Sequence, residues 1–112
     1  MHESGIAYDI YATSKRAAED NNAIRVKTIY VDVGSMAMVN PDQIEFMFNT
    51  FITDDKLFDN VKLKFNTINP KSECDCGYVG SEIFVCPKCG KLPKLIQGRE
   101  ILVTNIEIDT ED

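Results

Sequence analysis

The stretch CDCGYVGSEIFVCPKCG, residues 74–90, holds all four cysteines of the 112-residue chain. They form two pairs, Cys74 with Cys76 and Cys86 with Cys89, and nine residues separate the pairs. A secreted disulfide scaffold spreads its cysteines along the chain, where they cross-link loops. Clustered pairs in a cytosolic chain are typical of a metal site instead. We therefore expect residues 74–90 to form a module whose folding depends on a bound metal.

The second pair, CPKC at residues 86–89, is the stronger part of this signal. In such a turn both sulfurs face one centre, and backbone N–H groups can hydrogen-bond to the thiolates. Gly90 suits a chain that leaves the turn in a conformation other residues adopt at a cost. The first pair, CDC at residues 74–76, makes a tighter turn. The predicted ligands of the site are Cys74, Cys76, Cys86 and Cys89.

Four thiolates in a tetrahedron favour a structural Zn²⁺, because no coordination position is left open for water. Soft sulfur ligands also suit an iron–sulfur cluster or Cu(I), so the residues alone leave these metals as alternatives. A redox enzyme that uses its thiols directly is a further alternative, and it requires an exposed thiolate of low pKa.

Alternating apolar residues predict a strand on either side of this stretch. One covers residues 61–68 and ends before Pro70, and the other follows Gly98. The inward-facing positions are expected to be Val61, Leu63, Phe65 and Thr67 in the first strand, and Leu102, Thr104, Ile106 and Ile108 in the last.

The N-terminal half predicts a helix over residues 4–22, capped by Ser4, and a strand over residues 24–33. Because this strand has apolar residues on both faces, we expect it to be central in its sheet. Asn40 is typical of a helix N-cap, and Pro41 suits the first helical position. The apolar stripe of this second helix is Ile44, Met47, Phe48, Phe51 and Ile52.

These elements predict an α+β fold: a small two-layer domain with a three-stranded sheet and two helices on one face, plus an inserted zinc-ribbon-like four-cysteine module. We expect residues 1–70 and 98–112 to form the α/β domain, and residues 71–97 to form the zinc-binding module.

Charge and composition exclude several classes of function. With 12 basic and 18 acidic residues the chain has a net charge of −6, which argues against a nucleic-acid binder. Its apolar runs are too short for a membrane span, and its start has no secretory signal, so a cytoplasmic location is expected. A single histidine and no glycine-rich phosphate loop leave little basis for a hydrolase or transferase, so we do not expect an enzyme.

That histidine, His2, lies at a position that suggests a second metal site. The Met1 amine, the His2 amide nitrogen and His2 Nδ1 can close adjoining chelate rings on one metal. The Glu3 amide nitrogen or carboxylate can supply a fourth donor. A planar set of nitrogen donors is preferred by Ni(II) and Cu(II). The alternative interpretation is an ordinary histidine in an exposed tail.

Taken together, these motifs resemble the HypA/HybF family of hydrogenase nickel incorporation proteins. The resemblance is carried by MHE at residues 1–3, VDVG at 31–34, NP at 40–41, CPKC at 86–89 and GRE at 98–100. It covers nearly the whole chain and keeps the order of the elements.

The resemblance implies a metallochaperone that delivers Ni(II) for the active site of [NiFe]-hydrogenase and, in some organisms, for urease. His2 would be the principal nickel ligand, aided by the Met1 amine and by Glu3, and the four cysteines would hold structural zinc. The implied partners are a HypB-type GTPase and the hydrogenase large-subunit precursor, with the chain itself a monomer or weak homodimer. The competing hypothesis is a zinc-ribbon protein-interaction adaptor without nickel function, which explains the cysteines but not residues 1–3.

Overall fold

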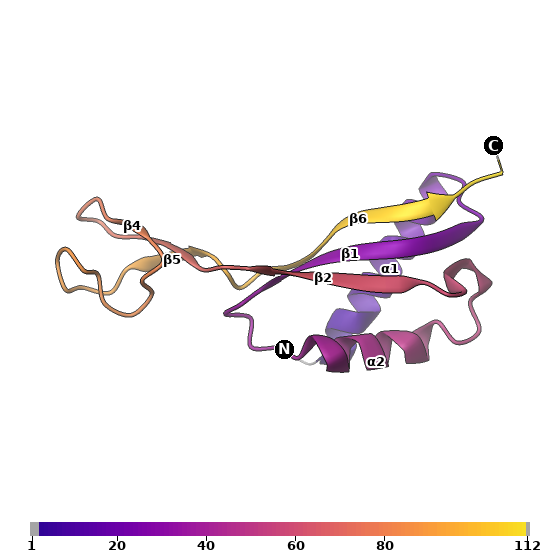
Figure 1. The fold of residues 1–112 in the computed structure, drawn as a ribbon, viewed down its shortest axis with the longest axis horizontal. Coiled ribbons are helices and arrows are strands. Elements are labelled where there is room, and N and C mark those ends of the chain that lie inside the picture. The colour runs from indigo at the N-terminus through magenta and orange to yellow at the C-terminus, as the bar shows by residue number, and fades with distance from the viewer. Residues whose placement is uncertain (1–2, 112) are drawn as a thin grey trace. The chain divides into compact units, whose positions relative to one another are not determined.

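The structure is a computed structural model, which describes residues 3–111 (Figure 1). Its helices are α1 (Glu3–Asp20), α2 (Pro41–Phe51) and the short 3-10 helix η1 (Lys56–Phe58). Its strands are β1 (Arg25–Gly34), β2 (Lys62–Ile68), β3 (Lys71–Glu73), β4 (Val79–Gly80), β5 (Lys94–Gln97) and β6 (Ile101–Asp109). The predicted α+β class and the predicted order of the two helices and three long strands are confirmed.

Two compact units divide the chain, and they are described separately below. The first comprises the described residues up to Val31, the segment Val39–Asn66, and the described residues from Leu102 onward. The second comprises Asp32–Met38 and Thr67–Ile101. The boundaries at residues 71 and 97 that the sequence suggests for a zinc-binding module remain a prediction about metal binding. Within residues 3–111, no helix combines the length and apolar character needed to cross a membrane.

Helix α1 begins one residue earlier than its sequence predicts, so Ser4 is a helical residue and not the cap. Its buried face carries Ile6, Ala7, Ile10, Ser14 and Ala18. The predicted stop at the asparagine pair is confirmed. Asn22 adopts a φ of 56°, and the Ala23 N–H donates to the Ala18 carbonyl at 2.9 Å, which closes the last turn.

Helix α2 has the predicted cap, since Asn40 Oδ1 accepts a hydrogen bond from the Asp42 N–H at 3.0 Å. Of its apolar stripe, Ile44 and Phe48 are fully buried. The Phe48 ring meets the Phe58 ring edge-on with centroids 6.0 Å apart. The Tyr11 ring of α1 has its centroid 5.3 Å from that of Phe58, so the two helices share one aromatic cluster.

Strand β1 is the central strand of a three-stranded sheet with the order β2-β1-β6, as predicted (Figure 1). In that view α1 passes behind the strands. The Ile24 N–H donates to the Asp109 carbonyl, and Thr104 Oγ1 donates to the Tyr30 carbonyl. The later residue near β1 therefore pairs with the earlier residue of β6, so these two strands run antiparallel.

The predicted inward face of β6 is wrong in its first half. Leu102 is 55% exposed and Thr104 is also exposed, whereas Ile101 and Val103 are half-buried. Past Asn105 the half-buried positions are Ile106 and Ile108, as predicted. The covered face therefore switches near Asn105, which strict alternation along a strand does not allow for. In β2, the prediction that Thr67 faces inward is also wrong, because Thr67 is exposed. Leu63 and Phe65 are half-buried, as predicted.

The second unit contains a small sheet that the sequence analysis did not predict. Its order is β4-β3-β5, and both neighbours pair with β3 in the antiparallel sense. Ser72, at the centre of β3, is fully buried, and its hydroxyl donates to the Glu82 carbonyl beside the Gly80 carbonyl. This sheet gives the cysteine-bearing loops a fixed base.

Candidate metal centre

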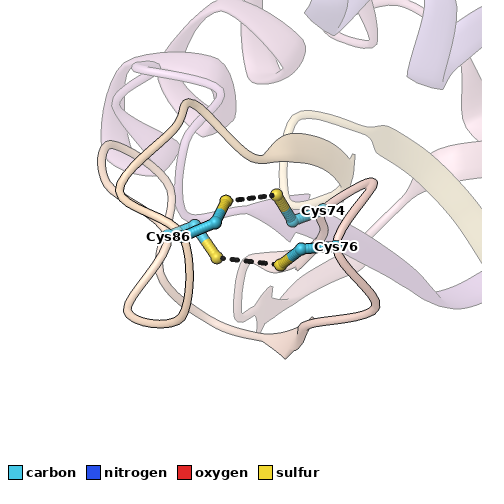
Figure 2. Close-up of side chains that lie close together, drawn as sticks. Cys74, Cys76 and Cys86 are labelled. Carbon is cyan, nitrogen blue, oxygen red and sulfur yellow. Dashed lines mark hydrogen bonds between the residues drawn. The ribbon is translucent and has the colours of Figure 1, made fainter.

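The first pair of cysteines lies in a tight turn between β3 and β4. The Cys74 N–H donates to the Tyr78 carbonyl, and the Gly77 N–H donates back to the Cys74 carbonyl, both at 2.9 Å. Gly77 has a φ of +100°, a conformation that residues with side chains rarely adopt. The turn brings the side chains of Cys74 and Cys76 to the same side of the loop (Figure 2).

The second pair lies in the turn before β5. The Cys86 N–H donates to the Lys91 carbonyl at 2.8 Å, and the Gly90 N–H donates to the Cys86 carbonyl at 2.9 Å. Gly90 has a φ of +76°, which confirms the reason given for a glycine at this position. Backbone N–H groups of the turn also donate to sulfur, those of Lys88 and Cys89 to Cys86 and that of Lys91 to Cys89.

The two turns face each other, so the four sulfurs gather at one point (Figure 2). All four lie within 4.8 Å of one another. The shortest approaches join one turn to the other, at 3.4 Å between Cys74 and Cys89 and 3.6 Å between Cys76 and Cys86. These separations are far above the length of about 2.05 Å of a disulfide bond, so the cysteines are four free thiols.

The sulfur positions fit a tetrahedral Zn²⁺ site. With zinc–sulfur bonds of about 2.3 Å, the sulfurs of a regular tetrahedron lie about 3.8 Å apart. The observed approaches of 3.4 and 3.6 Å, within an overall spread of 4.8 Å, need only small side-chain adjustments to reach that arrangement. Among residues 3–111 no other group of three or more histidine, cysteine or acidic side chains converges in this way.

The surroundings of Cys86 and Cys89 shift the pKa values of these two thiols in opposite directions. Burial raises the pKa of the Cys86 thiol, but the N–H groups of Cys89 and Lys88, aided by the neighbouring thiols, outweigh burial and lower it to about 6. For Cys89 the Lys91 N–H lowers the pKa, but the hydrogen bond with Cys74, burial and the other two thiols together raise it to about 12. Cys86 is therefore the more acidic of these two thiols, and hydrogen bonds from Cys76 and Cys89 favour its thiolate form. Binding of a metal ion would release the protons of the thiols that coordinate it, because thiols coordinate as thiolates.

One side of the four-thiol cluster is accessible. Cys86 is buried, whereas Cys76 and Cys89 are exposed. The hollow beside the cluster is lined by Cys74, Asp75, Cys76, Cys89, Lys91 and Leu92. Four sulfur ligands complete a tetrahedral zinc ion without an open position, so this arrangement suits a structural and not a catalytic metal.

The residues that hold the first turn in place were not predicted from the sequence. Ser72 ties β3 to the segment after β4, and the Tyr78 hydroxyl accepts a hydrogen bond from the Glu82 N–H at 3.4 Å. A Cβ at Gly80 would lie 2.2 Å from the Tyr78 hydroxyl oxygen, so a larger residue there would displace the Tyr78 side chain. The one available signal was the pair of glycines at positions 77 and 80, spaced within a nine-residue loop.

Of the predicted nickel ligands, Met1 and His2 lie outside the described residues. Glu3 is the first residue of α1 and is half-buried. In regular helix geometry the first N–H groups have no intrahelical partner, so the Glu3 amide does not take part in the hydrogen-bond ladder of α1.

Comparisons with known proteins agree on one family. A family profile described as "Hydrogenase/urease nickel incorporation, metallochaperone, hypA" matches residues 1–108. A hydrogenase maturation factor HypA from Methanocella arvoryzae is 34% identical over 113 residues, covering 97% of this chain and 99% of that protein. The factor of the same name from Methanosarcina barkeri is 31% identical and covers 100% of this chain and 98% of its own length.

Solved structures agree on the fold. The solution structure of the Ni metallochaperone HypA from Helicobacter pylori superposes with a TM-score of 0.78 at 23% identity, covering 99% of this chain and 100% of that one. A second solution structure of a HypA protein gives the same TM-score at 24% identity.

Proposed function

Because the chain belongs to the HypA family of hydrogenase and urease nickel-incorporation metallochaperones, we propose that it binds Ni(II) through Met1, His2 and Glu3 and hands the ion to a client enzyme. The observation that carries this proposal is the family match over residues 1–108, a range that contains both the N-terminal triplet and all four cysteines. The zinc-ribbon adaptor without nickel function is not favoured, since it accounts for the cysteines alone.

The proposed nickel site uses donors that suit release as well as binding. The Met1 amine and the amide nitrogens belong to the backbone, and the His2 imidazole is the one neutral side-chain donor. Planar nitrogen sets favour Ni(II) over hard cations such as Mg²⁺. Because α1 begins at Glu3, the partial positive charge of its N-terminus opposes a bound cation. This repulsion weakens the site and favours handover. The chemistry is transfer of a metal ion and not catalysis.

The second proposed metal is a structural Zn²⁺ held by Cys74, Cys76, Cys86 and Cys89. When bound, it cross-links the two turns and neutralises part of the thiolate charge. The backbone N–H groups already aimed at Cys86 and Cys89 sulfur support this assignment, because such bonds stabilise coordinated thiolates. In this proposal residues 71–97 are the zinc-binding module, and residues 1–70 with 98–112 are the nickel-binding domain.

We infer that the partners are a HypB-type GTPase and the hydrogenase large-subunit precursor, with urease as a further client where the organism has one. The chain acts in this proposal as a monomer or weak homodimer in the cytoplasm, where a reducing environment keeps four clustered thiols available for metal. Its net charge of −6 speaks against nucleic acid as a partner.

The start of the chain provides the test. We compare Ni(II) titrations of the native-start protein with those of a form extended by Gly-Ser before Met1, both loaded with zinc. The extension moves the terminal amine away from His2, so the chelate cannot close, and nickel binding is expected to weaken at least tenfold. The same extension leaves the zinc content unchanged at one per chain. Equal nickel affinity in the two proteins would contradict the proposed site.

A further inference from the structure

A group of exposed apolar and basic side chains surrounds the second cysteine turn. Phe84 is 75% exposed, Leu92 is 76% exposed, and Val85 is also exposed. The lysines of the same segment are exposed as well. We call this set the knuckle surface, and its members are Phe84, Val85, Lys88, Lys91, Leu92 and Lys94.

Backbone hydrogen bonding brings the two halves of the knuckle surface together. The Cys86 N–H donates to the Lys91 carbonyl at 2.8 Å, which holds the peptide after Val85 against the peptide before Leu92. Leu92 and Lys91 both line the hollow beside the sulfurs. The apolar side chains are therefore anchored on a segment that the metal site itself fixes.

The exposed apolar side chains are unusually dense in this module. Of the eleven large hydrophobic side chains that are exposed among the described residues, five lie within residues 79–96. They are Val79, Phe84, Val85, Leu92 and Ile96. Single exposed apolar residues need no explanation, but several gathered on one small element mark an interaction site.

Charge distinguishes the same segment from the rest of the chain. Residues 83–97 contain three lysines and no acidic residue, whereas the whole chain has 18 acidic and 12 basic residues. The nearest acidic residues of the module, Glu73, Asp75 and Glu82, belong to the first turn and its flanks. The knuckle surface is thus a basic and apolar region on an otherwise acidic protein.

We propose that the knuckle surface docks a protein segment that presents apolar side chains flanked by carboxylates. Large apolar side chains form the centre of protein interfaces, and charged side chains at the rim steer the partner and fix its orientation. A protein is favoured over a nucleic acid because a phosphate backbone offers Phe84 and Leu92 no apolar counterpart. The inference rests on the proposed function in one respect, namely that the partner is a protein that supplies or receives nickel.

A role of the lysines in balancing the charge of the metal site makes a different prediction from a role in docking. A zinc ion with four thiolates carries a charge of −2, and nearby lysines reduce its field. That role requires neither Phe84 nor Leu92 on the surface, and its loss would lower zinc affinity and leave docking unchanged.

The experiment measures binding of the zinc-loaded chain to two purified proteins of the same organism, the HypB-type GTPase and the hydrogenase large-subunit precursor. One variant is Lys88→Glu with Lys91→Glu, and another is Phe84→Ser with Leu92→Ser. The matched controls are Lys56→Glu with Lys62→Glu, which are exposed lysines elsewhere, and Phe46→Ser, which is 65% exposed on α2. All the altered side chains are exposed and none is a predicted ligand, so every variant should keep its zinc. Zinc content is measured for each variant to check this.

We expect both knuckle variants to weaken binding to at least one of the two proteins at least tenfold, and the controls to change it less than twofold. Raising the ionic strength from about 0.1 M to about 1 M shortens the Debye length from about 10 Å to about 3 Å. It should therefore weaken binding of the unaltered chain more than that of the lysine variant.

Several results would overturn the proposal. They are equal affinity in all variants, failure of the unaltered chain to bind either protein, and loss of zinc with no effect on docking. The proposal would also fail if the knuckle variants changed only the oligomeric state, from dimer to monomer. It would fail as well if the chain bound a 20-mer oligonucleotide through the lysines and without need of Phe84 and Leu92. His2→Ala separates this inference from the proposed function, since it should abolish nickel binding and leave docking intact.

Discussion

Gly34, the last residue of β1, shows how a single side chain would disturb the second unit. Its N–H donates to the Glu100 carbonyl at 2.7 Å, and the Met36 N–H donates to the Gly98 carbonyl at the same distance. These bonds hold the two backbones so close that a Cβ on Gly34 would lie 2.1 Å from the Gly98 carbonyl oxygen. Since that atom belongs to the backbone, it cannot rotate out of the way.

We therefore predict that Gly34→Ala destabilises the protein by about 1–3 kcal/mol, the range expected when an extra methyl group is forced into a packed site. Urea unfolding of the zinc-loaded protein measures it. Gly5→Ala is the matched control, because a Cβ at Gly5 meets nothing within 4 Å and alanine is favoured inside a helix. That change should stabilise the protein by up to about 1 kcal/mol. A neutral Gly34→Ala would show that the two backbones are not held this closely.

At this scale the sequence predicts local conformations well and long-range contacts poorly. The Asn40 cap and the positive φ of Gly90 followed from rules that involve neighbouring residues only. The strand predicted over residues 24–33 agrees with β1, which ends at Gly34. The approach of Gly34 to Gly98, 64 positions later, had no local signature.

A polar cluster joins α1 to the segment between α2 and η1. Asp55 Oδ2 accepts hydrogen bonds from Lys15 Nζ and from the Tyr11 hydroxyl, each at 2.8 Å. Asp55 also caps η1, since its Oδ1 accepts the Leu57 N–H at 3.1 Å. Burial raises the pKa of the Asp55 carboxyl, but the hydrogen bonds from Lys15, Tyr11 and Leu57 outweigh it, so the pKa is lowered.

This lowered pKa gives the cluster a defined pH dependence. The ionised Asp55 carboxylate contributes fully to the free energy of unfolding above the unfolded-state pKa of aspartate, about 3.9. This contribution is lost as the pH falls through the lower folded-state pKa. We predict that Asp55→Asn destabilises the protein by about 1 kcal/mol at pH 7, a figure reduced for solvent exposure. The difference from the unaltered protein should shrink when unfolding is measured near pH 3. A difference that grows as the pH falls would have the wrong sign for this account.

The folding of the cysteine module is expected to depend on bound metal. Its sheet has strands of three, two and four residues, and its buried side chains are few, among them Ser72 and Cys86. Such a unit has too small a core to fold alone, so metal binding should supply its stability.

We predict that chelation of zinc unfolds residues 73–95 and leaves the helices and the β2-β1-β6 sheet folded. Amide chemical shifts recorded before and after chelation would show loss of dispersion in this segment only. The double variant Cys74→Ser with Cys89→Ser provides the control, since it should resemble the chelated protein from the start. Unchanged shifts in residues 73–95 after demetallation would contradict the prediction.

Long amphipathic elements were predictable, and short or twisted ones were not. The stripe from Ile44 to Phe48 identified α2 and its buried face, but Phe51 at the end of the stripe proved exposed. Periodicity shows which side of an element is apolar, not how far its neighbours cover it. The three strands β3, β4 and β5 are shorter than the usual five or six residues, so alternation could not reveal them.

For the whole molecule, the cysteine spacing predicted the cluster that the structure forms, because metal geometry constrains four sulfurs more tightly than packing constrains a core. Family membership, shown by the match over residues 1–108, agrees with the resemblance seen in the sequence motifs. The knuckle surface could not be predicted from the sequence. Phe84 and Leu92 are apolar residues beside predicted ligands, and their exposure is a property of the folded turn.

The most direct test of the central claim is an Ni(II) titration of the zinc-loaded, native-start protein beside His2→Ala, followed by calorimetry, with zinc content measured on both. Our account predicts one tightly held zinc in each protein and a nickel-binding event that the variant loses, because the imidazole closes the chelate. Identical nickel binding in the two proteins would contradict it, and would leave a zinc-ribbon adaptor as the better description.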